Sequence, residues 1–126
     1  MTSRLILCAV SIGLFFGSGI ILKDLSDIPG DQKSGLVTLP IHWGRNLAVK
    51  VSCFGQLVAT SLGYTYLILV RASVSVFGWM TLSLVMSLTG TMTLLHRKQR
   101  YWGPGMLMAY TSQFIFELAL ILSNKQ

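Results

Sequence analysis

The stretch that decides the fold is LILCAVSIGLFFGSGIILKDLSDIPGD, residues 5–31, where an uncharged apolar run meets three aspartates. Residues 5–22 carry no charge and approach the roughly 20 residues that a helix needs to cross a bilayer. Three further apolar runs follow, at residues 51–70, 72–95 and 106–122. Each run predicts a membrane-spanning helix, because every backbone polar group inside hydrocarbon needs a partner.

Composition supports a membrane protein. Of the 126 residues 52% are hydrophobic and 11% are charged, against about 25% charged in soluble domains. The ten Lys and Arg residues lie mainly between the apolar runs, and no nucleic-acid-binding motif is present, so we expect no nucleic acid partner. We predict an all-α, multi-pass membrane helical bundle of about four transmembrane helices, at residues 4–23, 46–70, 72–96 and 104–123, with an aspartate-rich loop at residues 23–44.

Basic residues in the connecting loops predict the orientation. The loops after the first and third helices carry seven of them, namely Lys23, Lys33, Arg45, Lys50, Arg97, Lys98 and Arg100. The other side carries three, namely Arg4, Arg71 and Lys125. Cytoplasmic loops collect Lys and Arg, so the aspartate-rich loop is expected on the cytoplasmic side, or on the equivalent matrix or stromal side of an organelle. Four crossings then leave both termini on the opposite side.

The aspartates Asp24, Asp27 and Asp31 have the spacing D-x-x-D-x-x-x-D. In a continuous helix this spacing would place all three within about 60° of one face. Pro29 and Gly30 favour a turn instead. We therefore expect a helix end that carries Asp24 and Asp27, followed by a turn that swings Asp31 round.

The chemistry of this loop suits a metal–diphosphate. Crowded carboxylates repel one another unless a cation is present. Mg²⁺ is usually held by one or two carboxylates together with substrate phosphates and waters. Lys23 and Lys33 flank the acids and could pair with the remaining phosphate oxygens. The alternative is a solvated loop whose charges only set the topology.

The segment KDLSDIPGDQKSGLVTLPIHWG, residues 23–44, closely resembles the second aspartate-rich motif of the UbiA superfamily of intramembrane prenyltransferases. The family pattern is matched at Lys23, Asp24, Asp27, Gly30, Asp31, Gly35, Thr38, Leu39, Pro40 and Gly44. The resemblance implies transfer of an isoprenoid chain from a prenyl diphosphate to an aromatic or lipid acceptor, with Mg²⁺ as the cofactor. It also implies that the prenyl tail lies in an apolar cavity, in a protein surrounded by membrane lipid.

Carried over residue by residue, the resemblance makes Asp27 and Asp31 the central catalytic residues and Mg²⁺ ligands. Asp24 becomes a third catalytic acid and metal ligand. Lys23 and Lys33 become diphosphate-binding residues.

One departure from the family is large. Its active members have a fold of about nine helices and carry a first motif, N-D-x-x-D, in their N-terminal half. No such motif occurs in this sequence, which resembles the C-terminal four helices only. We therefore expect the chain alone to be inactive. Three interpretations stay open, namely a truncated gene product, a domain fragment, and one half of a split enzyme whose partner is a separate N-terminal half. The competing hypothesis is a non-catalytic four-helix membrane subunit, or a pseudoenzyme, with an acidic docking loop.

Other polar residues are interpreted as structural. Glu117 lies four residues after Gln113 in the last apolar run, so the two share a helix face, and we expect a hydrogen-bonded structural Glu. No nucleophile–base pair supports hydrolase chemistry. Single residues of the remaining reactive types are expected at the interface or in packing, namely His42, His96, Cys8, Cys53, Tyr64, Tyr66 and Tyr110. The tyrosines could also touch an isoprenoid or an acceptor.

Overall fold

The structure, a computed structural model, describes residues 2–94 and 102–123. Within this part every regular element is a helix and no strand occurs, which confirms the all-α prediction. His96 and the basic residues 97–100 lie outside the described residues, as does Lys125. The helices are α1 (Thr2–Lys33), α2 (Leu39–Trp43), α3 (Arg45–Leu69), α4 (Val74–Thr93) and α5 (Trp102–Ser123).

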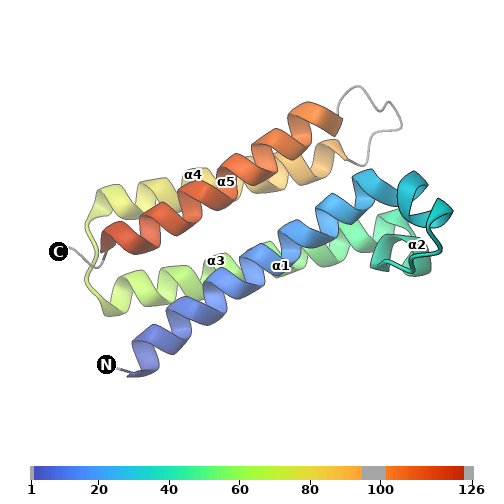
Figure 1. Cartoon of the computed structure of the whole chain (residues 1–126). Coiled ribbons are helices and arrows are strands. Elements are labelled where there is room, and N and C mark those ends of the chain that lie inside the picture. Colours follow the sequence, from blue (N-terminus) through green and yellow to red (C-terminus); the bar gives the residue numbers. More distant parts are fainter. Residues whose placement is uncertain (1, 95–101, 124–126) are drawn as a thin grey trace.

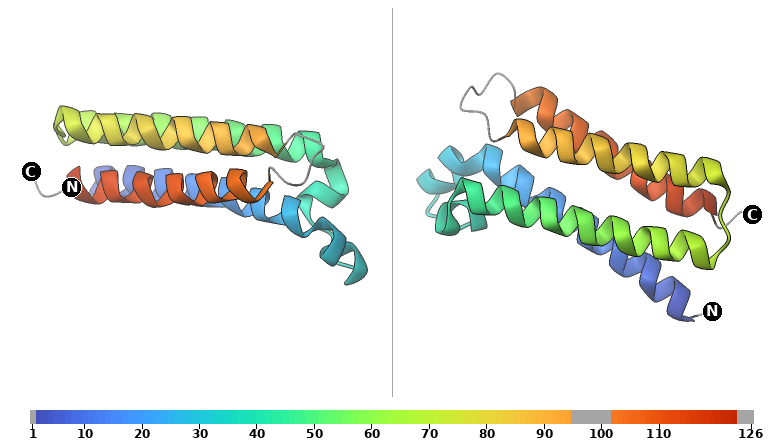
Figure 2. Two further views of the ribbon diagram at one scale, coloured as in Figure 1. Left: turned by 90° about the horizontal axis from the view of Figure 1, so that it is seen from above. Right: turned by 180° about the vertical axis from the view of Figure 1, so that it is seen from behind.

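The four long helices run alongside one another as a bundle (Figure 1). Helix α1 packs mainly on α3, and α4 mainly on α5. Both chain ends lie at one end of the bundle, and the aspartate-bearing end of α1 lies at the other, beside α2 (Figures 1 and 2). The acids and the termini therefore occupy opposite ends of the bundle, while the side of the membrane on which each lies stays a prediction.

Three of these helices are long and apolar enough to cross a membrane, over Ser3–Lys33, Val74–Thr93 and Gly103–Ser123. Helix α3 has sufficient length, with 25 residues, but polar side chains such as Gln56 and Thr60 lower its hydropathy. Those two side chains are fully buried in the bundle, and so is Ser52. The fourth crossing thus stays a prediction, because polar groups that pack inside a bundle weaken the hydropathy signal of their own helix.

Helix α1 continues to Lys33, so the predicted helix end near residue 23 and the turn at Pro29 and Gly30 are wrong. Pro29 lies inside the helix. The fixed φ of proline is compatible with a helix. Because proline has no N–H, one backbone hydrogen bond is lost and the helix bends locally. Figure 2 shows this end of α1 turning away from the bundle. Since the helix is unbroken, Asp31 stays on it, instead of being carried off by a turn.

The helix stops at Gly35, which has a left-handed φ of 69°. The N–H of Leu36 donates to the carbonyl oxygen of Asp31 at 2.9 Å, and the N–H of Gly35 donates to that of Gln32 at 3.3 Å. These two bonds form a Schellman motif, for which glycine is the favoured residue. Gly44, with φ 83°, makes the second sharp turn before α3. The two glycines of the aspartate-rich segment thus redirect the chain back into the bundle.

The core has an apolar cluster towards each end and hydrogen-bonded polar side chains between helices. Near the chain termini Phe15 stacks on Phe116, with ring centroids 4.2 Å apart. In the interior the Nε2 of Gln56 donates to Thr91 Oγ1 at 3.1 Å and links α3 to α4. Both cysteines are free; Cys53 is buried, as predicted, and Cys8 is half-buried. Buried polar side chains such as Gln56 and Thr91 therefore contribute to helix packing.

Candidate functional site

The candidate site begins with the aspartates on the last turns of α1. Because the helix is continuous, Asp24, Asp27 and Asp31 lie within about 60° of one face and span about 10 Å along its axis. Asp27 is exposed, while Asp24 and Asp31 are half-buried. The structure therefore brings all three predicted acids onto one side of a single helix.

The same face of α1 continues towards the termini as two exposed glycines, Gly13 and Gly17. Helical geometry places Gly13, Gly17 and Asp24 within about 40° of one another around the axis, with Gly17 about 10 Å below Asp24. A Cβ atom added to either glycine would meet nothing within 4 Å. The helix surface below the acids is thus open and lacks side chains.

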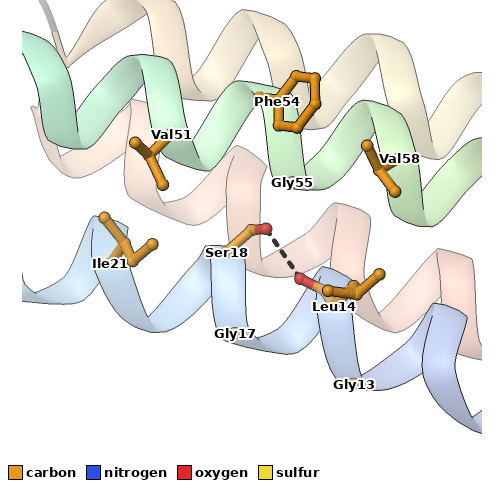
Figure 3. Close-up of a pocket in the computed structure, with 9 residues that line it drawn as sticks. All are labelled: Gly13, Leu14, Gly17, Ser18, Ile21, Val51, Phe54, Gly55 and Val58. Carbon is orange, nitrogen blue, oxygen red and sulfur yellow. Dashed lines mark hydrogen bonds between the residues drawn. The ribbon is translucent and has the colours of Figure 1, made fainter.

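This open surface is one wall of a groove of about 400 Å³ between α1 and α3 (Figure 3). Its volume lies within the range of roughly 300–1,000 Å³ that is common for small-molecule sites. The only hydroxyl in its lining, that of Ser18, donates to the carbonyl oxygen of Leu14 at 2.8 Å, so the groove surface is apolar. The lining residues are Gly13, Leu14, Gly17, Ser18, Ile21, Val51, Phe54, Gly55 and Val58.

The three aspartates offer carboxylate oxygens to a metal ion without enclosing it. Among residues 2–94 and 102–123 no group of three or more His, Cys, Asp or Glu lies close enough to hold a metal ion. The pairs Asp24–Asp27 and Asp27–Asp31 have the three- and four-residue spacing that places helix side chains about 5–6 Å apart at Cβ. In a Mg²⁺ site the protein usually supplies one or two carboxylates, and phosphate oxygens and waters supply the other ligands. The aspartates of α1 fit that number of protein ligands, and they do not surround an ion on their own.

The two predicted lysines are placed differently. Lys23 is exposed four residues before Asp27, on the same side of the helix. Lys33 is also exposed, but it lies about 200° around the axis from Asp31. The helix therefore groups Lys23 with the acids and turns Lys33 away from them.

Sequence reasoning missed how α5 contributes to this end of the molecule. A cleft of about 150 Å³ between α1 and α5 is lined by Lys23 together with Tyr110 and Gln113. Tyr110 thus shares a cleft with Lys23, the neighbour of Asp24 in the sequence. Tyr110 was expected mainly in packing, and only the pairing of α1 with α5 relates it to the acids.

The segment after the acids is held by α2 and the start of α3. The Arg45 guanidinium donates to the carbonyl oxygen of Leu94, which ties α3 to the end of α4. A pocket of about 340 Å³ lies beside α2, lined by Val37, Thr38, Leu39, His42 and Trp43. His42 is exposed next to Trp43, and its position at the membrane interface stays a prediction.

Glu117 lies far from the acids along α5. Gln113, one turn before it, faces α1 and donates from Nε2 to the carbonyl oxygen of Phe15 at 3.3 Å. Glu117 itself is half-buried in the half of α5 nearer the C-terminus. It therefore lies outside the candidate site, on the side of the bundle away from the acids.

Comparisons with known proteins identify no relative. No protein-family model matches the chain, and no curated protein or solved structure matches it significantly. The candidate site must therefore be interpreted from its own residues and from the motif in residues 23–44.

Proposed function

We propose that this chain is the diphosphate-binding part of a Mg²⁺-dependent prenyltransferase of the UbiA type. The observation that carries the proposal is the alignment of Asp24, Asp27 and Asp31 with Gly13 and Gly17 on one face of α1. Polar ligands for a metal–diphosphate then lie at the end of an apolar groove long enough to take part of a prenyl tail. One molecule with a charged head and an apolar chain fits both features.

In the proposed reaction the allylic C–O bond of a prenyl diphosphate breaks and its electron pair leaves with the diphosphate. An aromatic or lipid acceptor then bonds to the prenyl carbon and releases a proton, which the departing diphosphate takes up. Asp24, Asp27 and Asp31 supply the oxygen ligands, and Mg²⁺, when bound, would offset the charge that builds on the leaving group. Lys23 pairs with a diphosphate oxygen, and the groove excludes water from the apolar chain. Lys33 is the weaker candidate, since the helix directs it away from the acids.

The proposal includes a partner. Asp27 is exposed and the acids leave most coordination positions of an ion open. A separate N-terminal half that carries its own aspartate motif would supply the remaining ligands of the metal ion and cover this face of α1. The chain alone is then expected to bind a prenyl diphosphate weakly and to be inactive as a transferase.

The proposed membrane placement uses four crossings, with α3 as the fourth, in a nine-helix fold of which this chain forms the C-terminal part. The acidic end faces the cytoplasm, or the matrix or stroma, because the basic residues gather there. A cysteine placed at exposed Leu36 should react with an impermeant maleimide added from that side only, in a background without Cys8 and Cys53. Labelling of Leu36→Cys from the opposite side would reject this orientation.

The second candidate is a non-catalytic membrane subunit with an acidic docking surface. It is favoured by the absence of a three-ligand group in the described part of the chain. The two functions differ in one respect: a docking surface binds its partner without needing Mg²⁺ or a diphosphate.

The test is equilibrium binding of a non-reactive prenyl diphosphate analogue to the purified chain in detergent. Asp27→Asn should weaken Mg²⁺-dependent binding by about ten-fold or more, because a ligand of the metal–diphosphate is lost. Glu117→Gln is the matched control, since it also neutralises one carboxylate of a membrane helix but lies away from the site. Equal binding by both variants would favour the docking subunit.

A further inference from the structure

The cleft between α1 and α5 has a polar end and an apolar end. Lys23 and Tyr110 lie at the end nearer the acids, and Phe16, Gly19 and Ile20 form the wall below them. At about 150 Å³ the cleft is smaller than the roughly 300 Å³ at which small-molecule pockets begin. It can therefore hold a headgroup, but not a whole lipid.

The width of this cleft is set by one close approach. A Cβ atom on Gly19 would lie 2.2 Å from Nε2 of Gln113, so only glycine leaves room for that side chain. From this position Gln113 donates to the carbonyl oxygen of Phe15 at 3.3 Å and fastens α5 to α1. Tyr110 lies about one turn nearer the acids on α5, as Lys23 does on α1. Tyr110 and Lys23 therefore line the part of the cleft nearer the acids.

The hydrogen-bond donors at this level suit a phosphate group. Lys23 and Tyr110 line the same cleft, and Lys23 is one turn from Asp27 on the same side of α1. An ammonium and a phenol are both hydrogen-bond donors, and phosphate oxygens are strong acceptors. A phosphate bound there would contact both donors while its other oxygens faced the acids and their cation.

We propose that Tyr110 and Lys23 bind the phosphate end of the ligand at the mouth of the α1–α5 cleft, with the Tyr110 hydroxyl donating to a phosphate oxygen. The inference rests on the proposed function and adds a residue of α5 to a site otherwise formed by α1. The shared chemistry is a phosphate ester, which could come from a prenyl diphosphate or from the headgroup of a bilayer lipid.

The test uses inorganic pyrophosphate with Mg²⁺ as the probe and the full chain in phosphatidylcholine nanodiscs. Tyr110→Phe should weaken pyrophosphate binding by about ten-fold, the effect of one hydrogen bond to a charged oxygen. Tyr64→Phe is the control, because the Tyr64 hydroxyl pairs with Thr81 on α4 instead. It should change the affinity by less than about two-fold, and Tyr110→Phe should melt at the wild-type temperature.

The outcomes separate this inference from the function on which it rests. Unchanged binding by Tyr110→Phe, together with a loss in Asp27→Asn, would overturn the role of Tyr110 and leave the proposed function standing. No pyrophosphate binding by the wild-type chain, or no effect of either variant, would overturn both. Weaker binding in nanodiscs that contain phosphatidylglycerol, seen in the wild type and absent in Tyr110→Phe, would support the phosphate site and assign it to a lipid headgroup.

Discussion

Gln113 of α5 donates a hydrogen bond from Nε2 to the carbonyl oxygen of Phe15 on α1 at 3.3 Å. Its side chain occupies the space that a Cβ atom on Gly19 would fill. This contact joins two residues that are 98 positions apart in the sequence, and it lies nearer the chain termini than the proposed phosphate site. Gln113 also lines the cleft that contains Lys23 and Tyr110, so this hydrogen bond and that cleft share one side chain.

The first prediction concerns Gly19. Gly19→Ala should displace the Gln113 side chain and lower the free energy of unfolding by about 1 kcal/mol, since an interhelical hydrogen bond in a membrane protein is worth up to that order. Gly17→Ala is the control, because nothing lies within 4 Å of the added Cβ. Reversible unfolding in mixed detergent micelles measures both. Equal stability of the two variants would show that Gln113 does not fasten the helices.

A second prediction concerns the packing of α4 on α5. A Cβ on Gly90 would lie 2.6 Å from the carbonyl oxygen of Gly105, and backbone cannot step aside as a side chain can. Gly90→Ala should therefore cost about 1–3 kcal/mol of stability, as overpacking usually does. Gly78→Ala on the same helix meets nothing within 4 Å and should be neutral or slightly stabilising. Thermal unfolding that ranks Gly78→Ala below Gly90→Ala would contradict this packing.

The third prediction concerns the polar contact between α3 and α4. Gln56 and Thr91 are both fully buried and bonded at 3.1 Å. Gln56→Leu, Thr91→Val and the double variant should give a coupling energy of about 0.6 kcal/mol, the average for such bonds in membrane proteins. Thr65→Val, which removes only a bond to the carbonyl oxygen of Ser61 on the same helix, is the control. Strictly additive effects would mean that the bond does not stabilise the bundle.

The fourth prediction concerns the groove. Gly17→Leu, whose Cβ meets nothing within 4 Å, should occupy part of the groove and weaken binding of the prenyl diphosphate analogue, because apolar surface for the tail is lost. The same variant should bind inorganic pyrophosphate as the wild type does. Gly78→Leu introduces the same side chain into open space on α4 and should change neither affinity. If Gly17→Leu weakens both ligands equally, the groove does not hold the tail.

Three helices were predicted from hydropathy to within a few residues, as shown by α3, which begins at Arg45 against a prediction of 46. Apolar run length and flanking charges determine where such helices lie, and both are local properties. The sequence predicts the end of α1 too early, because proline inside a helix usually breaks it, whereas α1 continues through Pro29 to Lys33. Gly35, with the left-handed φ that completes the Schellman motif, is the actual stop.

The candidate site was predicted only in part, for a related reason. The acids and Lys23 follow from a motif in one segment, so the sequence could identify them. Tyr110, Gln113 and the groove wall of α3 depend on which helices pack together, and hydropathy carries no information on pairing. Lys33 points away from the acids because α1 continues through Asp31 to Lys33, and the sequence alone does not predict that continuation.

The central claim is that the acidic face of α1 holds a metal–diphosphate, and the most direct test is the Mg²⁺ dependence of analogue binding. A Mg²⁺ titration should raise the affinity of the wild-type chain and of Glu117→Gln by about ten-fold or more, since each carboxylate–metal–phosphate link is a strong charge-assisted contact. The double variant Asp27→Asn/Asp31→Asn should show no such rise. A Mg²⁺-dependent rise in the double variant equal to that of the wild type would contradict the account.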